Sequence, residues 1–97
     1  MSDVKTQLSE EIAEVYWEDL IPHVKQDRVI IVNQSLNLLD AGLALANNDT
    51  KLVNKWIENN IISKPTQQQL SNWNSMPKTK FETIIVQPFV LITLLSM

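Results

Sequence analysis

The chain has 97 residues, a length that fits one domain over residues 1–97 and is too short for two. Its 44% hydrophobic and 20% charged residues are typical of a globular chain rather than a disordered one. With no cysteine, one histidine and one glycine, the composition excludes thiolate chemistry, multi-histidine metal sites and glycine-rich phosphate loops. A formal charge of −3 provides no basic field for nucleic acid.

The N-terminal segment is acidic and amphipathic. Apolar residues recur at helical spacing from Leu8 to Leu20, which predicts a helix. Because Pro22 cannot lie deep in a helix, we expect a break near Trp17 and a second, short helix over about residues 19–26. The first helix would carry an acidic ridge, either a solubilising face or a docking surface for a basic partner, formed by Glu10, Glu14 and Glu18 together with Glu11 and Asp19.

The next segment combines a strand with a buried helix. Four consecutive β-branched residues within Arg28–Val32 predict a buried strand. Asn33 or Ser35 would then cap a helix over residues 36–46. That helix is apolar on nearly every side, so we expect it at the centre of the core.

A further helix is predicted over residues 50–59, with Asp49 as its N-cap. Its apolar stripe consists of Leu52, Val53, Trp56 and Ile57, and we expect Trp56 to be buried in the core. Because glycine is scarce, asparagine should supply the left-handed backbone at helix ends. The pairs Asn47-Asn48 and Asn59-Asn60 are therefore predicted as C-caps or tight turns.

The C-terminal third is predicted to hold strands around one helix. Residues 61–63 form a short strand, and the Thr66–Gln69 capping box opens a helix. Residues 81–86 form a clear strand, Pro88 marks a sheet edge or bulge, and residues 89–95 continue as strand. This apolar end is shorter than the roughly 20 residues that a membrane-spanning helix needs.

These elements predict an α+β domain with a small sheet of about three strands packed against four to five helices. The predicted order is α-α-β-α-α-β-α-β. A winged-helix-like arrangement is one form that this order can take. The N-terminus has neither the basic start nor the apolar core of a signal peptide, so we expect a soluble cytoplasmic protein.

Four pieces of the sequence resemble a family of small bacterial proteins known only as a domain of unknown function. They span about residues 8–92 and comprise Trp17–Leu20, Leu38–Asp49, Val53–Ile57 and Ile85–Ile92. The resemblance implies a stand-alone cytoplasmic bacterial protein. It implies no activity, cofactor or catalytic residue.

Two polar features are candidates for chemistry. Asp19 lies four residues before His23, so on a helix the carboxylate faces the imidazole, as a general base would require. A solvated surface pair is the more common reading of that spacing. Asp40 lies among leucines and alanines, where it faces water, forms a buried pair with a partner such as Arg28, or contributes to a ligand site.

Apolar residues at two places suggest an interaction surface. Trp17 lies among acids at the helix break and is expected to be partly exposed. The strand over residues 89–95 is apolar on both faces apart from Thr93, so either helices of the same chain cover both sides or another chain does. We favour cover by a second copy or another protein through edge pairing. The proposed surface consists of Trp17, Phe89, Val90, Ile92 and Leu94.

We therefore expect a non-enzymatic protein-interaction or regulatory module, with no catalytic residues, metal or cofactor and a homodimer as one form. One alternative is a winged-helix-like nucleic-acid regulator, in which Lys51 and Lys55 would face DNA and Lys78 and Lys80 a wing. The acidic balance of 11 Asp and Glu against 8 Lys and Arg opposes that reading. A further alternative is a regulator that binds a small metabolite in an apolar pocket between helices and sheet.

Overall fold

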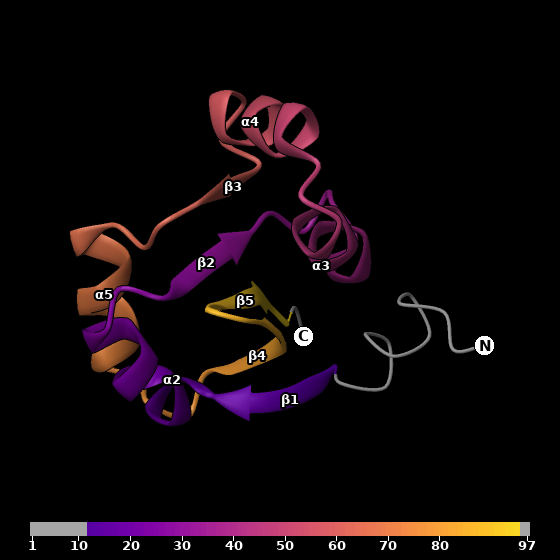
Figure 1. Cartoon of the computed structure of the whole chain (residues 1–97). Helices are drawn as coiled ribbons and strands as arrows, with labels where there is room; N and C mark the ends of the chain where they lie inside the picture. The colour runs from indigo at the N-terminus through magenta and orange to yellow at the C-terminus, as the bar shows by residue number, and fades with distance from the viewer. Residues whose placement is uncertain (1–11, 96–97) are drawn as a thin grey trace.

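The computed structural model describes residues 12–95, in which helices lie on both faces of one mixed β-sheet (Figure 1). The α+β class predicted from the sequence is confirmed, but the sheet has five strands rather than three. The elements in chain order are β1 (Ala13–Tyr16), α2 (Trp17–Lys25), β2 (Val29–Val32), α3 (Leu38–Ala46), α4 (Thr50–Glu58), β3 (Ile62–Ser63), α5 (Gln67–Asn74), β4 (Lys80–Val86) and β5 (Phe89–Leu94).

The strands lie in the order β1-β4-β5-β2-β3, so β5 is the central strand. β4 and β5 form an antiparallel hairpin in register from Phe81↔Leu94 to Val86↔Phe89. On its other side β5 pairs with β2 in parallel. Our prediction of a C-terminal edge strand is therefore wrong. Pro88, in a cis peptide with Gln87, lies in the turn, where its missing N–H removes no bond from the sheet.

The N-terminal prediction is also corrected. Ala13–Tyr16 is a strand rather than part of a helix, and it pairs with β4, placing Val15 opposite Phe81. A helix over this segment would leave that edge of β4 without hydrogen-bond partners. The helix α2 consequently begins at Trp17 and contains Pro22 in its interior. The rest of the expected first helix, including Leu8, lies outside the described residues.

Most of the predicted caps are confirmed. The Asp49 carboxylate accepts a bond from the Leu52 N–H, and the capping box of α5 closes with bonds of 3.0 and 3.1 Å. Asn48 and Asn60 adopt φ angles of 55° and 58°, as expected of asparagine in place of glycine. The N-cap of α3 is Asn37, whose side chain accepts from Leu39 N–H.

Neither residue that we predicted as the cap of α3 has that role. The Asn33 side chain instead accepts the Ser35 N–H at 2.9 Å and closes a turn before the helix. This is the local bonding by which asparagine side chains favour turns. The helix begins two residues later than predicted, at Leu38.

An aromatic cluster fills the space between the sheet and the helices α2 and α5, which lie side by side in Figure 1. The Trp17 ring lies 5.0 Å from Trp73 and 5.8 Å from Phe81, measured between ring centroids. The Trp17 indole N–H donates to the Asn74 side chain at 2.8 Å. Trp17 is 0% exposed, so the expectation of a partly exposed tryptophan is wrong. It is buried because Trp73 of α5 and Phe81 of β4 cover its ring.

An aliphatic cluster fills the opposite face, beneath α3 and α4. Ile84 of β4 and Leu91 of β5 are fully buried there, and Trp56 of α4 joins them as predicted. Because a five-stranded sheet lies between two helix layers, the winged-helix-like form is not the observed arrangement. None of the helices in residues 12–95 has the length and apolar character that a bilayer crossing requires.

Candidate functional site

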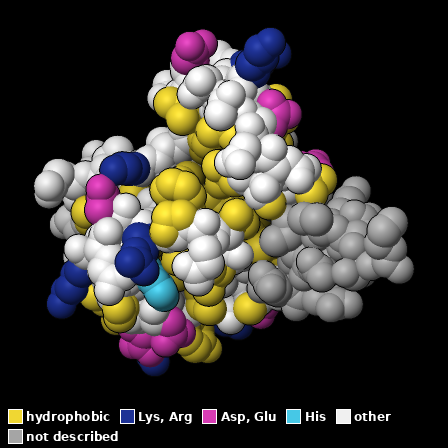
Figure 2. Space-filling model, viewed as in Figure 1, with side chains coloured by type: hydrophobic (Ala, Val, Ile, Leu, Met, Phe, Trp, Pro, Cys, Tyr) yellow, Lys and Arg dark blue, Asp and Glu magenta, His cyan; other side chains and the backbone are white. Residues whose placement is uncertain are grey.

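An apolar groove lies on the aliphatic side of the sheet, below α4. Its volume is about 440 Å³, and its walls come from five elements of the fold and the segments that flank them. Figure 2 shows hydrophobic side chains gathered between α4, at the top of the view, and the sheet below it. The apolar lining consists of Ile30, Leu45, Val53, Ile57, Ile62 and Phe89, and the polar lining of Asn60, Ser63 and Lys64.

The groove exists because α4 uses only part of its apolar stripe for packing. α4 contacts α3 and β3, and Trp56 points into the aliphatic cluster. Val53 and Ile57 lie one turn apart and therefore on the same side of the helix. Ile57 is 51% exposed, and Phe89, at the start of β5, is 37% exposed. The space between these two side chains is left open to solvent.

The polar lining is confined to one stretch of chain, Asn60–Lys64. β3 pairs with β2 so that Ile31 lies opposite Ser63, which brings Lys64 level with Ile30. The Lys64 ammonium forms an ion pair with Asp27 at 2.7 Å, and both side chains are mostly exposed. The lining therefore includes a cation whose partner is itself in contact with water.

The lining carries a single charged side chain. Of the described residues that line the groove, Lys64 alone is charged, and its partner Asp27 is not among them. Arg28 precedes β2, and its carbonyl oxygen accepts the Val90 N–H at 2.9 Å, which places the Arg28 backbone beside that of Phe89. An otherwise apolar lining thus holds one cation and no carboxylate.

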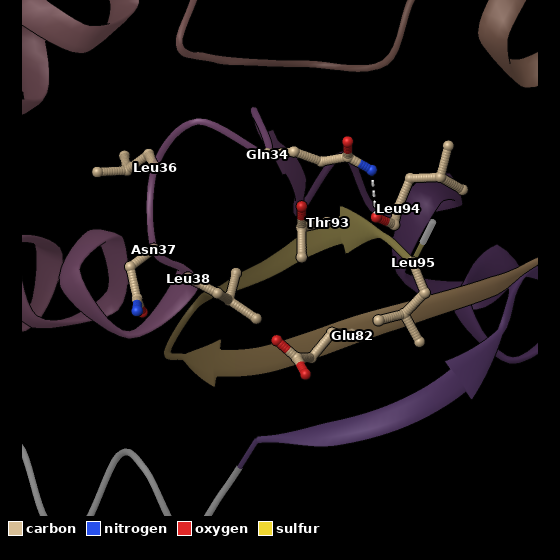
Figure 3. A pocket seen from close by; sticks show the side chains of 8 residues that line it. All are labelled: Gln34, Leu36, Asn37, Leu38, Glu82, Thr93, Leu94 and Leu95. Carbon is tan, nitrogen blue, oxygen red and sulfur yellow. Dashed lines mark hydrogen bonds between the residues drawn. The ribbon is translucent and has the colours of Figure 1, made fainter. Parts of the chain in front are cut away.

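A second hollow, of about 500 Å³, lies between the start of α3 and the β4–β5 hairpin. The Gln34 amide donates to the Leu94 carbonyl oxygen at 2.6 Å across its rim (Figure 3). The buried Thr93 hydroxyl has no hydrogen-bond partner. In Figure 3 it points toward Gln34 and away from the Glu82 carboxylate. The polar groups of this hollow therefore do not converge on one point.

The predicted Asp19–His23 pair does not form. The Asp19 carboxylate accepts the backbone N–H of Tyr16 at 3.1 Å, which caps the start of α2. None of the ion pairs within residues 12–95 joins Asp19 to His23. Asp40 is exposed on α3, which supports the solvent-facing reading and excludes a buried pair with Arg28.

The acidic ridge is broken up by the fold. Glu14 lies in β1 and Glu18 in α2, so they do not share one helix face, while Glu10 lies outside the described residues. Lys78 donates to Glu18 at 2.6 Å. This hydrogen bond, aided by the negative charge of Glu18, raises the pKa of Lys78 above its usual value. The predicted acidic face is therefore partly neutralised at this point.

The C-terminal surface that we predicted is only partly exposed. Val90 and Ile92 are buried against the α2–α5 side, and helices cover both faces of β5. Leu94 is exposed but lies outside the apolar groove. Of the strand residues in the predicted surface, Phe89 alone lines that groove.

The family described as "Protein of unknown function (DUF2288)" matches residues 3–93. This chain belongs to the DUF2288 family. No curated protein matches it. The NMR solution structure of PA1075 from Pseudomonas aeruginosa matches with a TM-score of 0.82 and 23% identity, over 100% of this chain and 89% of that chain. At this identity the likeness shows the fold alone.

The groove of this DUF2288 chain uses residues that our sequence reasoning did not select. Ile57 belongs to the predicted apolar stripe of its helix, and its neighbour Trp56 was taken as the core residue. The only sequence signal that could have identified Ile57 is the width of the apolar stripe, which is greater than a single helix contact can bury. Lys64 carries no such signal, because the sheet register alone brings it level with Ile30. Within residues 12–95, the structure assembles no group of three or more potential metal-ligating side chains.

Proposed function

We propose that this DUF2288 chain is a non-enzymatic regulatory module that acts by binding, and that the apolar groove is its binding site. The observation that supports this proposal is the groove's construction from five elements. Its volume of about 440 Å³ lies in the range of small-molecule sites. Apolar walls with a few polar groups are also typical of such sites.

The exposed apolar surface at the rim supplies a driving force for binding. Ile57 and Phe89 stay half-open to water across the groove from each other. A ligand that covers both would remove apolar area from water at about 25 cal/mol per Å². A monomer leaves such area exposed without any gain in its own stability, so a patch of this kind often marks a binding site.

The proposal is tested with 1-octanol as a neutral apolar probe, followed through backbone amide shifts in ¹H–¹⁵N NMR spectra. We expect saturable shifts confined to residues around the groove. Ile57→Glu places a charge in the groove and should weaken binding about tenfold or more, because it desolvates a carboxylate against the ligand. Unsaturable or scattered shifts would overturn the proposal.

Met76→Glu is the matched control for that experiment. Met76 is 56% exposed, close to the value for Ile57, and it lies in the loop after α5, away from the groove. The same change of charge at a similarly exposed apolar residue should leave octanol binding at the wild-type level. An equal loss in both variants would show that net charge, and not the groove, controls binding.

A second candidate function is protein docking at the same groove, including docking of a second copy of the chain. The exposed ring of Phe89 at the rim favours it, because aromatic anchors often dominate interface energies. Sedimentation velocity up to high micromolar concentration tests the self-association form. A wild-type dimer that becomes monomeric in Ile57→Glu would support it, and a monomer throughout would exclude it.

A further inference from the structure

We infer that the groove binds a small amphipathic acid, a molecule with an aliphatic or aromatic tail and one carboxylate. The inference rests on the proposed function, since it names the ligand class of the same site. The tail would lie among the apolar walls, and the carboxylate would meet the ammonium group of Lys64. Two features of the groove lead to this class: where its polar groups lie, and what charge they carry.

The polar part of the lining is small and comes from one part of the chain. Of the residues that line the groove, the polar ones all come from the short stretch Asn60–Lys64, and the others are aliphatic or aromatic. A ligand that satisfies such a lining has one polar head and one continuous apolar part. A sugar or nucleotide, polar on all sides, would leave most of its hydrogen-bonding groups unpaired against the apolar walls.

The charge of the lining favours an anionic ligand. Of the described residues that line the groove, Lys64 alone is charged. Asp27, the ion-pair partner of Lys64, is not part of the lining. Since the lining carries one cation and no carboxylate, an anionic head is favoured over a neutral or a cationic one.

The existing ion pair does not block this role. The Lys64 and Asp27 side chains are 65% and 74% exposed, and ion pairs of such exposure are weak. An ammonium group carries three donors, so Lys64 can bond to Asp27 and to a ligand carboxylate at the same time. The carboxylate of the ligand would therefore bind Lys64 without displacing Asp27.

The test compares three probes with the same eight-carbon tail, octanoate, 1-octanol and octylamine, below their aggregation concentrations at pH 7. Binding to the full chain is measured by calorimetry and by amide shifts at the groove. We expect octanoate to bind about tenfold tighter than octanol, and octylamine to bind weakest. From hexanoate to octanoate the affinity should rise about fourfold per methylene group.

Lys64→Gln removes the cation and keeps a polar side chain. It should lower octanoate affinity about tenfold, to the level that octanol shows in the same variant. Lys78→Gln is the matched control, because it removes the same charge and an exposed ion pair of similar length, 2.6 Å against 2.7 Å, away from the groove. Its octanoate affinity should stay at the wild-type value.

The outcomes separate this inference from the function on which it rests. Equal binding of octanol and octanoate would overturn the inference of an acidic ligand and leave the groove as a binding site. Equal losses of octanoate affinity in Lys64→Gln and Lys78→Gln would do the same. If none of the three probes shifts the groove amides, both the inference and the proposed function fail. A wild-type chain that dimerises through the groove and excludes octanoate would also overturn the inference.

Discussion

The two faces of the central sheet are packed in different ways. On the α2–α5 face, Trp17, Trp73 and Phe81 meet at ring-centroid distances of 4.9 to 5.8 Å and leave no comparable apolar opening in the described chain. On the α3–α4 face the cluster is mainly aliphatic, and it opens into the groove at Ile57 and Phe89. Large aromatic rings contribute much of the buried area of a core, so the first face is expected to hold most of the stability.

The comparison suggests a division of roles within one small domain. On a fully packed face the apolar side chains contact one another and are not available to a ligand. A helix that packs along one side only, as α4 does, keeps apolar side chains available at its margin. The candidate site lies where packing is incomplete. Substitutions on the two faces of the sheet should therefore differ in their effect on stability.

The largest effect on stability is expected for Trp17→Ala on the fully packed α2–α5 face. This change removes a fully buried indole and leaves the Asn74 side chain without its donor. We expect a loss of about 4–5 kcal/mol in the free energy of unfolding, at the upper end for large buried aromatics. Urea unfolding followed by circular dichroism measures it, and an unchanged midpoint would contradict the packing described for this face.

Trp56→Ala is the same substitution on the α3–α4 face, which opens into the groove. Trp56 is buried, but it lines a separate hollow of about 360 Å³ between α3 and α4, the helix that also borders the groove. We expect a loss of about 3 kcal/mol, the lower end of the range, because the neighbouring side chains can relax into open space. If Trp56→Ala cost more than Trp17→Ala in the same urea experiment, the proposed ranking of the two faces would be reversed.

Two threonines provide a matched pair across the sheet. The Thr83 hydroxyl is buried on the α2–α5 face and donates to the Leu91 carbonyl oxygen at 2.8 Å, whereas the Thr93 hydroxyl on the opposite face has no partner. Thr83→Val should cost about 1 kcal/mol, and Thr93→Val should be neutral or slightly stabilising. Equal costs in thermal or urea unfolding would show that Thr93 does have a partner in solution.

Gly42→Ala should stabilise the α3–α4 face. A Cβ atom at this position would lie 3.5 Å from Ile84 and Val86, which is ordinary van der Waals contact, and no positive φ requires glycine. The gain should be about 0.5–1 kcal/mol, because alanine loses less backbone freedom in a helix. A decrease in melting temperature would indicate that α3 lies closer to the sheet than described.

The smallest effect is expected at Lys78. Its pKa is raised by the hydrogen bond to Glu18, so the stabilisation from this pair is present below the usual lysine pKa of 10.5 and is lost as the pH rises through the higher folded-state value. Lys78→Gln should therefore lower the melting temperature slightly near neutral pH and converge with wild type in strong alkali. A constant difference across that range would exclude the ion pair as its cause.

The helix boundaries were the most predictable part of this protein. Asp49, the Thr66–Gln69 box and the two asparagine pairs were assigned correctly from residue type alone. Each of these signals acts through hydrogen bonds or backbone preferences within a few residues. They therefore need no knowledge of which other segment lies nearby.

Which strands pair with one another was decided only by the tertiary structure. Val15 fits a helix by spacing and a strand by alternation, and pairing with β4 selected the strand. The C-terminal segment formed a hairpin about Pro88 and became the centre of the sheet once β2 bonded to its other side. Such long-range pairings depend on partners that no local pattern specifies.

The candidate site belongs mainly to this second category, because Phe89 alone among its lining residues was part of the surface predicted from the sequence. The pattern of apolar and turn residues determined that the chain would form a small α+β domain with an apolar core. Residue type determined where α4 begins and ends, where α3 ends and where α5 begins. The groove required Ile57 of α4, Lys64 after β3 and Phe89 of β5 to converge. Their convergence follows from sheet register and from the partial packing of α4, because both are set by contacts between elements and not by the sequence within any one of them.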